Sequence, residues 1–178
     1  MQRGPGIWVL GPRDSVQVGI PVVSFTSIRK ARLDEAASLT ALAIRSKAYW
    51  GYDAEFMFKA VPELTLDPDK FGPDFLVFVL EADGCYFGFY SLIPLDAATI
   101  ELHDLFVDPD HVGTGLGASL WRHAVQTARA LNYQTIMLTA DPHAVPFYVR
   151  RGAVTRNYVT SPIQMDRSLP RMKYQIPG

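Results

Sequence analysis

Three glycines placed two residues apart, Gly113, Gly115 and Gly117, most constrain what this chain can fold into. They follow a strand-like run at 98–107 and precede a stretch whose apolar residues recur every three or four positions, as in an amphipathic helix. Glycines at such a junction let backbone N–H groups approach an anion, and a helix N-terminus favours negative charge. A tight packing turn also uses glycines, so the segment by itself leaves both interpretations open.

The hydrophobic pattern around this segment predicts both helices and strands. Asp83-Gly84 lies between two apolar runs and predicts a β-hairpin, which a third run extends into an antiparallel meander. Asp53 predicts the N-cap of a helix that Pro62 ends, and Asp141-Pro142 predicts the start of another helix, which ends at Gly152. Strands are expected at 22–29, 74–82, 85–93, 98–107, 135–139, 154–160 and 171–176, and helices at 34–50, 53–61, 116–131 and 141–152.

This order, β-α-α-β-β-β-α-β-α-β-β, predicts an α/β fold with a mixed, mostly antiparallel central sheet and helices on both faces. A length of 178 residues suits one domain. We expect residues 1–21, rich in glycine and proline, to form an N-terminal extension, and residues 22–178 to form a single domain. The exposed last strand could pair between subunits, so a homodimer is possible.

Composition excludes several classes of protein. The net charge of −1 argues against an overall basic nucleic-acid binder. A single cysteine, Cys85, cannot form an internal disulfide, and no apolar run reaches the roughly 18 residues of a membrane span. The first residues also lack a secretory signal pattern, so we expect a cytoplasmic protein.

The near-zero charge hides an uneven distribution. Residues 1–112 contain 9 basic and 16 acidic residues, whereas residues 113–178 contain 8 basic and 2 acidic ones. Solvated faces would explain this split, and so would two halves that face oppositely charged ligands.

Two other phosphate-binding patterns fit the glycine segment poorly. Gly113-x-Gly115-x-x-Ala118 matches a dinucleotide fingerprint, but five residues separate it from the strand that ends at Val107, and a meander precedes it. No Lys-Ser or Lys-Thr follows, so the P-loop pattern fails. Nor is a metal expected, because the histidines and the cysteine show no ligand spacing: His103, His111, His123, His143 and Cys85.

Two motifs about 30 residues apart resemble the GNAT superfamily of N-acetyltransferases. The family's Gln/Arg-x-x-Gly-x-Gly/Ala motif falls on Val112–Gly117, and its Asn-x-x-Ala-x-x-Phe/Leu-Tyr-x-x-x-Gly-Phe motif falls on Asp141–Ala153. Three positions depart from the pattern, since Val112 replaces Gln or Arg, Asp141 replaces Asn, and Ala153 replaces Phe. By element order the resemblance covers about residues 22–176.

The resemblance implies a site for acetyl-CoA in a V-shaped opening between two strands. The pantetheine arm would pair with the main chain of 105–107, and the pyrophosphate would meet the backbone amides of the glycine segment. The implied cofactor-binding residues are Leu105, Phe106, Val107, Val112, Gly113, Gly115, Leu116, Gly117, Ala118, Asp141, Ala144 and Phe147.

The resemblance also implies catalytic groups. Tyr148 occupies the position of a tyrosine that protonates the leaving thiolate. Glu101 matches the glutamate that some members use as a base, and His103 is the competing candidate. The third possibility is that neither residue is the base. Strand alternation predicts Glu101, His103, Leu105 and Val107 on one face, and Leu102, Asp104 and Phe106 on the other.

Aromatic residues between the first two predicted helices could contact an amine acceptor: Tyr49, Trp50 and Tyr52. The sequence thus predicts acetyl transfer from acetyl-CoA to a primary amine of a small molecule, by direct attack in a ternary complex. A non-catalytic acyl-CoA sensor is the alternative, and a dinucleotide-binding oxidoreductase fits less well.

Overall fold

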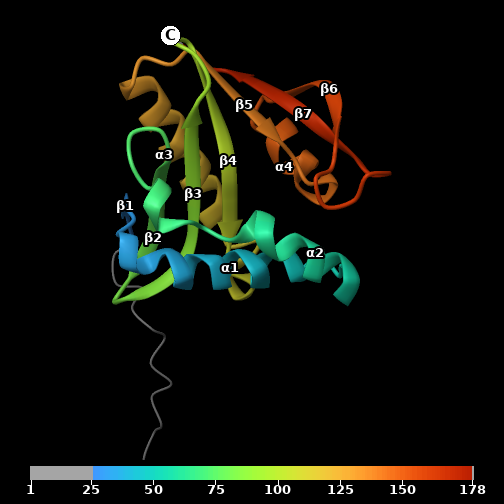
Figure 1. The fold of residues 1–178 in the computed structure, drawn as a ribbon. Coiled ribbons are helices and arrows are strands. Elements are labelled where there is room, and N and C mark those ends of the chain that lie inside the picture. Colours follow the sequence, from blue (N-terminus) through green and yellow to red (C-terminus); the bar gives the residue numbers. More distant parts are fainter. Residues whose placement is uncertain (1–25, 178) are drawn as a thin grey trace, which may run out of the picture.

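A seven-stranded sheet forms the centre of the fold, in the order β1-β2-β3-β4-β5-β7-β6 (Figure 1). The computed structural model describes residues 26–177. The predicted extension at 1–21 and the start of the predicted strand at 22–29 therefore lie outside the described residues. The strands are β1 (Ser27–Lys30), β2 (Leu76–Ala82), β3 (Cys85–Pro94), β4 (Thr99–Val107), β5 (Thr135–Thr139), β6 (Val154–Thr160) and β7 (Ser168–Gln175).

Four α-helices connect these strands in the predicted order. They are α1 (Ala36–Ala48), α2 (Ala54–Leu64), α3 (Leu116–Ala130) and α4 (Val145–Val149). Short 3-10 turns at Leu33–Glu35, Pro109–His111 and Pro142–Ala144 lead into α1, the glycine segment and α4, and a further one spans Pro68–Lys70. The predicted α/β fold with a mostly antiparallel sheet is confirmed. No described helix is long and apolar enough to cross a membrane.

Helices cover both faces of the sheet, and each face has its own core. On one face α3 and α4 pack on the sheet around Leu102, Leu120 and Ile136. On the other face α1 and α2 pack around Leu39, Phe56 and Phe89. In Figure 1, α1 crosses in front of the lower ends of the central strands, α2 follows it to the right, and α3 lies behind the strands.

Hairpin chemistry fixes the register of the meander. Asp83 and Gly84 have φ values of 51° and 77°, which is the conformation expected of an Asp-Gly hairpin turn. They join β2 to β3, and β3 in turn pairs with β4 in antiparallel fashion.

The sheet splits between β4 and β5, its one parallel pair of strands. Pairing runs from Thr99↔Thr135 only as far as Leu102↔Leu138. Beyond that point β5 pairs with β7 alone, and β4 and β5 diverge, as Figure 1 shows. The remainder of β4, residues 103–107, therefore has backbone groups that no neighbouring strand occupies on this side.

Two sequence expectations about elements are wrong. Pro62 lies inside α2 rather than after it, because the helix continues until Leu64 is buried on the same stripe as Phe56 and Ala60. The last strand, β7, is not exposed at an edge, since it lies between β5 and β6. Chain order does not determine order in space, and β6 takes the edge position.

Candidate active site

A cavity of about 530 Å³ occupies the split between β4 and β5. Its walls are the unpaired end of β4, the glycine segment, the end of β5 and the turn into α4. Every predicted cofactor-binding residue except Leu116 lines it: Leu105, Phe106, Val107, Val112, Gly113, Gly115, Gly117, Ala118, Asp141, Ala144 and Phe147. Two separated motifs of the sequence thus meet at one cavity.

The glycine segment presents the N-terminus of α3 to this cavity. Gly113 and Gly115 have φ values of 86° and 94°, and Gly115 is the N-cap residue of α3. A Cβ at either position would meet nothing within 4 Å, so the backbone conformation and not crowding requires glycine. The first-turn N–H groups of α3 lack partners within the helix, and together with the helix dipole they favour an anion.

Arginines add positive charge beside this anion site. Arg150 and Arg151 line the cavity and also an open groove next to it, which Arg122 and Arg129 of α3 share. The guanidinium carbon Cζ of Arg151 lies over the Phe147 ring, 3.5 Å from its centroid, and Arg151 donates a hydrogen bond to the Phe147 carbonyl. Position in the sequence alone did not distinguish these arginines from surface charges.

Tyr148 reaches the cavity from the α3 and α4 side. It is 7% exposed, and its ring packs edge-on against Trp121 with 5.5 Å between centroids. Burial raises the pKa of its hydroxyl above the usual range, and the nearby Asp104 carboxylate raises it further. The hydroxyl therefore keeps its proton at neutral pH and can only donate it.

A β-bulge in β4 changes which side chains share a face. Ser91 pairs with Asp104 and Leu92 pairs with Leu102, so His103 is an extra residue in the ladder. The predicted alternation is therefore wrong beyond Leu102. Leu105 and Val107 face the α3 core together with Leu102, whereas Phe106 faces the α1 core.

Glu101 and His103 lie on the α1 side of β4 at the bulge. Glu101 accepts a hydrogen bond of 2.7 Å from Arg171 and lies 3.5 Å from His103. Burial alone would raise the pKa of Glu101, but His103 and Arg171 lower it to about 2. The Glu101 carboxylate in turn raises the pKa of His103. His103 lines the cavity, whereas Glu101 does not.

Asp104, which the sequence did not single out, lines the same cavity. Its Oδ2 accepts a 2.6 Å hydrogen bond from Ser91, and its backbone N–H donates to the same hydroxyl oxygen at 3.1 Å. Burial raises the pKa of this carboxyl. The signal that would have found it is the bulge, which depends on the register with β3 and is not visible in β4 alone.

Asp141, at the end of β5, connects three segments of the chain. Its carboxylate lies 2.5 Å from Lys47 of α1, and it accepts hydrogen bonds from Tyr52 at 2.7 Å and Arg167 at 3.3 Å. Burial opposes ionisation, yet Lys47 and Tyr52 lower the pKa of Asp141 overall. The carboxylate also caps the turn before α4 by accepting from the backbone N–H of His143.

The three predicted acceptor residues take different positions. Trp50 lines the cavity and stacks on His143, with 5.1 Å between centroids and 6° between planes. Tyr49 packs edge-on against Trp50 and is half exposed. Tyr52 stacks on Phe56 instead, and burial together with Asp141 raises its pKa to about 12. Only Trp50 of the three contacts the cavity.

Among residues 26–177, no group of three or more His, Cys, Asp or Glu side chains is arranged to hold a metal ion.

Comparison with solved structures shows the same fold in other proteins. The GCN5-related N-acetyltransferase from Rhodopseudomonas palustris shares 23% identity over 86% of this chain and 98% of its own, with a TM-score of 0.69. The PaiA N-acetyltransferase from Thermoplasma acidophilum, solved with coenzyme A, shares 19% identity over 85% and 99% of the two chains, with a TM-score of 0.68. An aminoglycoside 6′-N-acetyltransferase complexed with coenzyme A shares 16% identity over 85% and 98%, with a TM-score of 0.67.

The fold and the cavity define an acetyltransferase domain of the GNAT type. Residues 41–153, more than half of the chain, match the acetyltransferase (GNAT) family, and the chain belongs to it. A comparison with curated proteins finds no match.

Proposed function

We propose that this protein transfers an acetyl group from acetyl-CoA to a primary amine of a small molecule, by direct attack in a ternary complex. The observation that carries the proposal is the cavity in the split between β4 and β5, with the N-terminus of α3 at its wall. An extended arm bearing amides and a pyrophosphate needs these two features together.

The residues of the cavity fit acetyl-CoA. The unpaired backbone of Leu105–Val107 offers hydrogen-bonding groups to the pantetheine amides, as an added strand would use them. The backbone amides of Gly113, Gly115 and the first turn of α3 suit the pyrophosphate. The side chain of Val112 has no hydrogen-bond donor to add to them. Arg150 and Arg151 supply positive charge next to these amides.

Tyr148 is suited to protonate the sulfur that leaves when the acetyl group is transferred. Tyr148 lines the cavity, and its hydroxyl is protonated at neutral pH, so a proton is at hand when negative charge develops on the sulfur. Trp50 and His143 form a stacked aromatic wall at the side of the cavity near α1, which suits the carbon skeleton of an acceptor.

The proposal is tested by ligand binding followed by turnover. Isothermal titration should show micromolar affinity for acetyl-CoA and none for NADH. A panel of amines incubated with acetyl-CoA should then yield at least one acetylated product by mass spectrometry. Binding of acetyl-CoA without turnover of any amine would favour a sensor instead, and binding of NADH alone would refute the proposal.

Replacing Tyr148 by phenylalanine tests the acid. Tyr148→Phe should lower kcat by about 10²-fold while the Kd for coenzyme A changes little, because the ring and its packing remain. Tyr158→Phe, on the exposed β6, is the matched control and should keep wild-type kcat. Equal kcat values for Tyr148→Phe and the wild type would exclude Tyr148 as the acid.

A further inference from the structure

Three ionisable groups of β4 gather at the bulge where the sheet splits: Glu101, His103 and Asp104. We propose that the Asp104 carboxylate is the group that takes the proton from the attacking amine. This inference rests on the proposed acetyl transfer, and it concerns a residue that neither the sequence motifs nor strand alternation indicated.

The contacts of Asp104 leave one carboxylate oxygen available. Oδ2 is held by the hydroxyl of Ser91, which is fully buried, so the carboxylate has a fixed orientation. Oδ1 has no hydrogen-bond partner among residues 26–177 and is not one of the unpartnered buried atoms there. Because Asp104 lines the cavity, its free oxygen is open to that cavity.

The two neighbouring groups are less able to accept a proton. Glu101 is paired with Arg171 and its pKa is lowered to about 2, so it is a weak base, and it is not among the residues that line the cavity. Glu101 raises the pKa of His103, which favours the protonated imidazole, the form that cannot accept a proton. Burial instead raises the pKa of Asp104, which makes its carboxylate a stronger base.

Asp104 and Tyr148 approach the cavity from opposite faces of the sheet. Ser91 and Asp104 are on the face that α1 covers, whereas Tyr148 belongs to the core beneath α3. Besides Asp104, His103 and Tyr148, the charged or polar side chains that line the cavity are Ser46, Lys47, His111, Thr139, Asp141, His143, Arg150 and Arg151. An amine entering from the α1 side would meet Asp104, while the thioester sulfur would lie towards Tyr148.

This arrangement accounts for both protons of the reaction. The amine nitrogen forms a bond to the acetyl carbonyl carbon and passes one proton to Asp104 Oδ1. The carbon–sulfur bond breaks, and the sulfur takes its electron pair together with the proton of Tyr148. The products are the acetylated amine and free coenzyme A, and solvent returns a proton to Tyr148 and removes one from Asp104.

The first test compares Asp104→Asn with the wild type on an amine that the wild type acetylates. We expect kcat to fall by about 10²-fold or more, with the Kd for coenzyme A by calorimetry unchanged within twofold. Retention of wild-type kcat would overturn the inference. If the wild type itself acetylates no amine, the proposed function fails, and the role of Asp104 with it.

A second test does not depend on the folding of Asp104→Asn. The pH at which kcat rises, measured at saturating amine, should match the pKa of the Asp104 carboxyl from NMR titration. Ser91→Ala removes the hydrogen bond that lowers this pKa, so both the carboxyl titration and the kcat profile should move to higher pH. Profiles that stay in place in Ser91→Ala would overturn the inference.

Discussion

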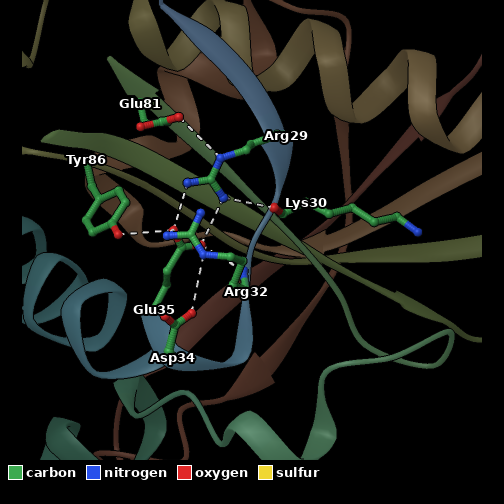
Figure 2. A network of polar contacts seen from close by, with 7 residues as sticks. All are labelled: Arg29, Lys30, Arg32, Asp34, Glu35, Glu81 and Tyr86. Carbon is green, nitrogen blue, oxygen red and sulfur yellow. Dashed lines mark hydrogen bonds and ion pairs between the residues drawn. The ribbon is translucent and has the colours of Figure 1, made fainter. Parts of the chain in front are cut away.

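A single buried carboxylate, Glu35, holds the N-terminal strand of the described chain in place. It is 2% exposed, and it accepts two hydrogen bonds from Arg29 of β1, at 2.7 and 3.0 Å. Tyr86 of β3 and the backbone N–H of Arg32 donate to it as well. Figure 2 shows these groups converging on the carboxylate. Removal of the charge would leave Arg29 without its main partner at the edge of the sheet.

The first prediction concerns Glu35 and pH. Arg29 lowers the pKa of Glu35 to about 2 from its ordinary 4.5, so ionisation favours the folded state. At about 1.4 kcal/mol per pKa unit, this amounts to at most about 3 kcal/mol, present above pH 4.5 and lost as the pH falls towards 2. Glu35→Gln should therefore lower the free energy of unfolding in urea at pH 7 by about 1–3 kcal/mol.

The unfolding free energies of the wild type and Glu35→Gln should converge as the pH is lowered from 6 to 3. The wild type then loses the stabilisation by ionised Glu35, which the variant lacks at every pH. Glu55→Gln is the matched control, because Glu55 is exposed and pairs only with Lys59 in the described structure. Its unfolding free energy should change by less than about 0.5 kcal/mol. A constant difference between Glu35→Gln and the wild type at all pH values would contradict the assignment.

At the scale of elements, local signals in the sequence predicted most of the fold. Asp83-Gly84 specified its hairpin, Asp53 capped α2 by accepting from the Phe56 N–H, and the apolar stripe of α3 marked its length. These features depend on a few neighbouring residues. The prediction that Pro62 ends α2 was wrong because the end of this helix is stabilised by burial of Leu64, which is a tertiary contact.

The candidate site was predictable where a motif sets the backbone and not where register sets the side chains. The glycine segment and the turn at Asp141 came together at one cavity, as the resemblance implied. The bulge at His103 depends on the pairing of β3 with β4, so alternation within β4 assigned Leu105 to the wrong face. Asp104 was overlooked for the same reason.

The second prediction, at the scale of elements, concerns the glycine segment. Gly115 caps α3 with a φ of 94°, which alanine adopts only at a cost of about 1–2 kcal/mol. A shift of the backbone to relieve this strain would turn the first amides of α3 away from the cavity. Gly115→Ala should therefore weaken binding of coenzyme A by about tenfold in calorimetry, in addition to lowering stability.

Gly84→Ala separates these two effects. Gly84 also has a positive φ, of 77°, and a Cβ there would likewise meet nothing within 4 Å, but it lies in the β2–β3 hairpin. This variant should lose a similar amount of stability and keep wild-type affinity for coenzyme A. Equal affinity in the two variants would mean that the α3 N-terminus does not hold the pyrophosphate.

At the scale of the whole molecule, the structure shows where part of the uneven charge of the sequence lies. The basic C-terminal region contributes Arg122 and Arg129 on α3, and Arg150 and Arg151 after α4, all lining the groove beside the cavity. The acidic excess lies in residues 1–112, which form β1–β4 as well as α1 and α2, and α1 itself carries only the basic Arg45 and Lys47. The net charge of −1 is thus the sum of this acidic excess and a basic region whose arginines gather beside the cavity.

The last prediction follows from this arrangement. Arg150 lines both the cavity and the groove, and its guanidinium makes no hydrogen bond to other described residues, so it is free to meet a phosphate. Arg150→Gln should weaken binding of coenzyme A roughly fivefold, about 1 kcal/mol, and reduce the dependence of Kd on salt. Arg156→Gln, on the exposed β6 away from the cavity, changes the net charge equally. Long-range attraction depends on total charge, whereas a direct contact depends on the position of the residue. Equal losses of affinity for coenzyme A in the two variants would therefore assign the effect to net charge. A loss confined to Arg150→Gln would assign it to the groove.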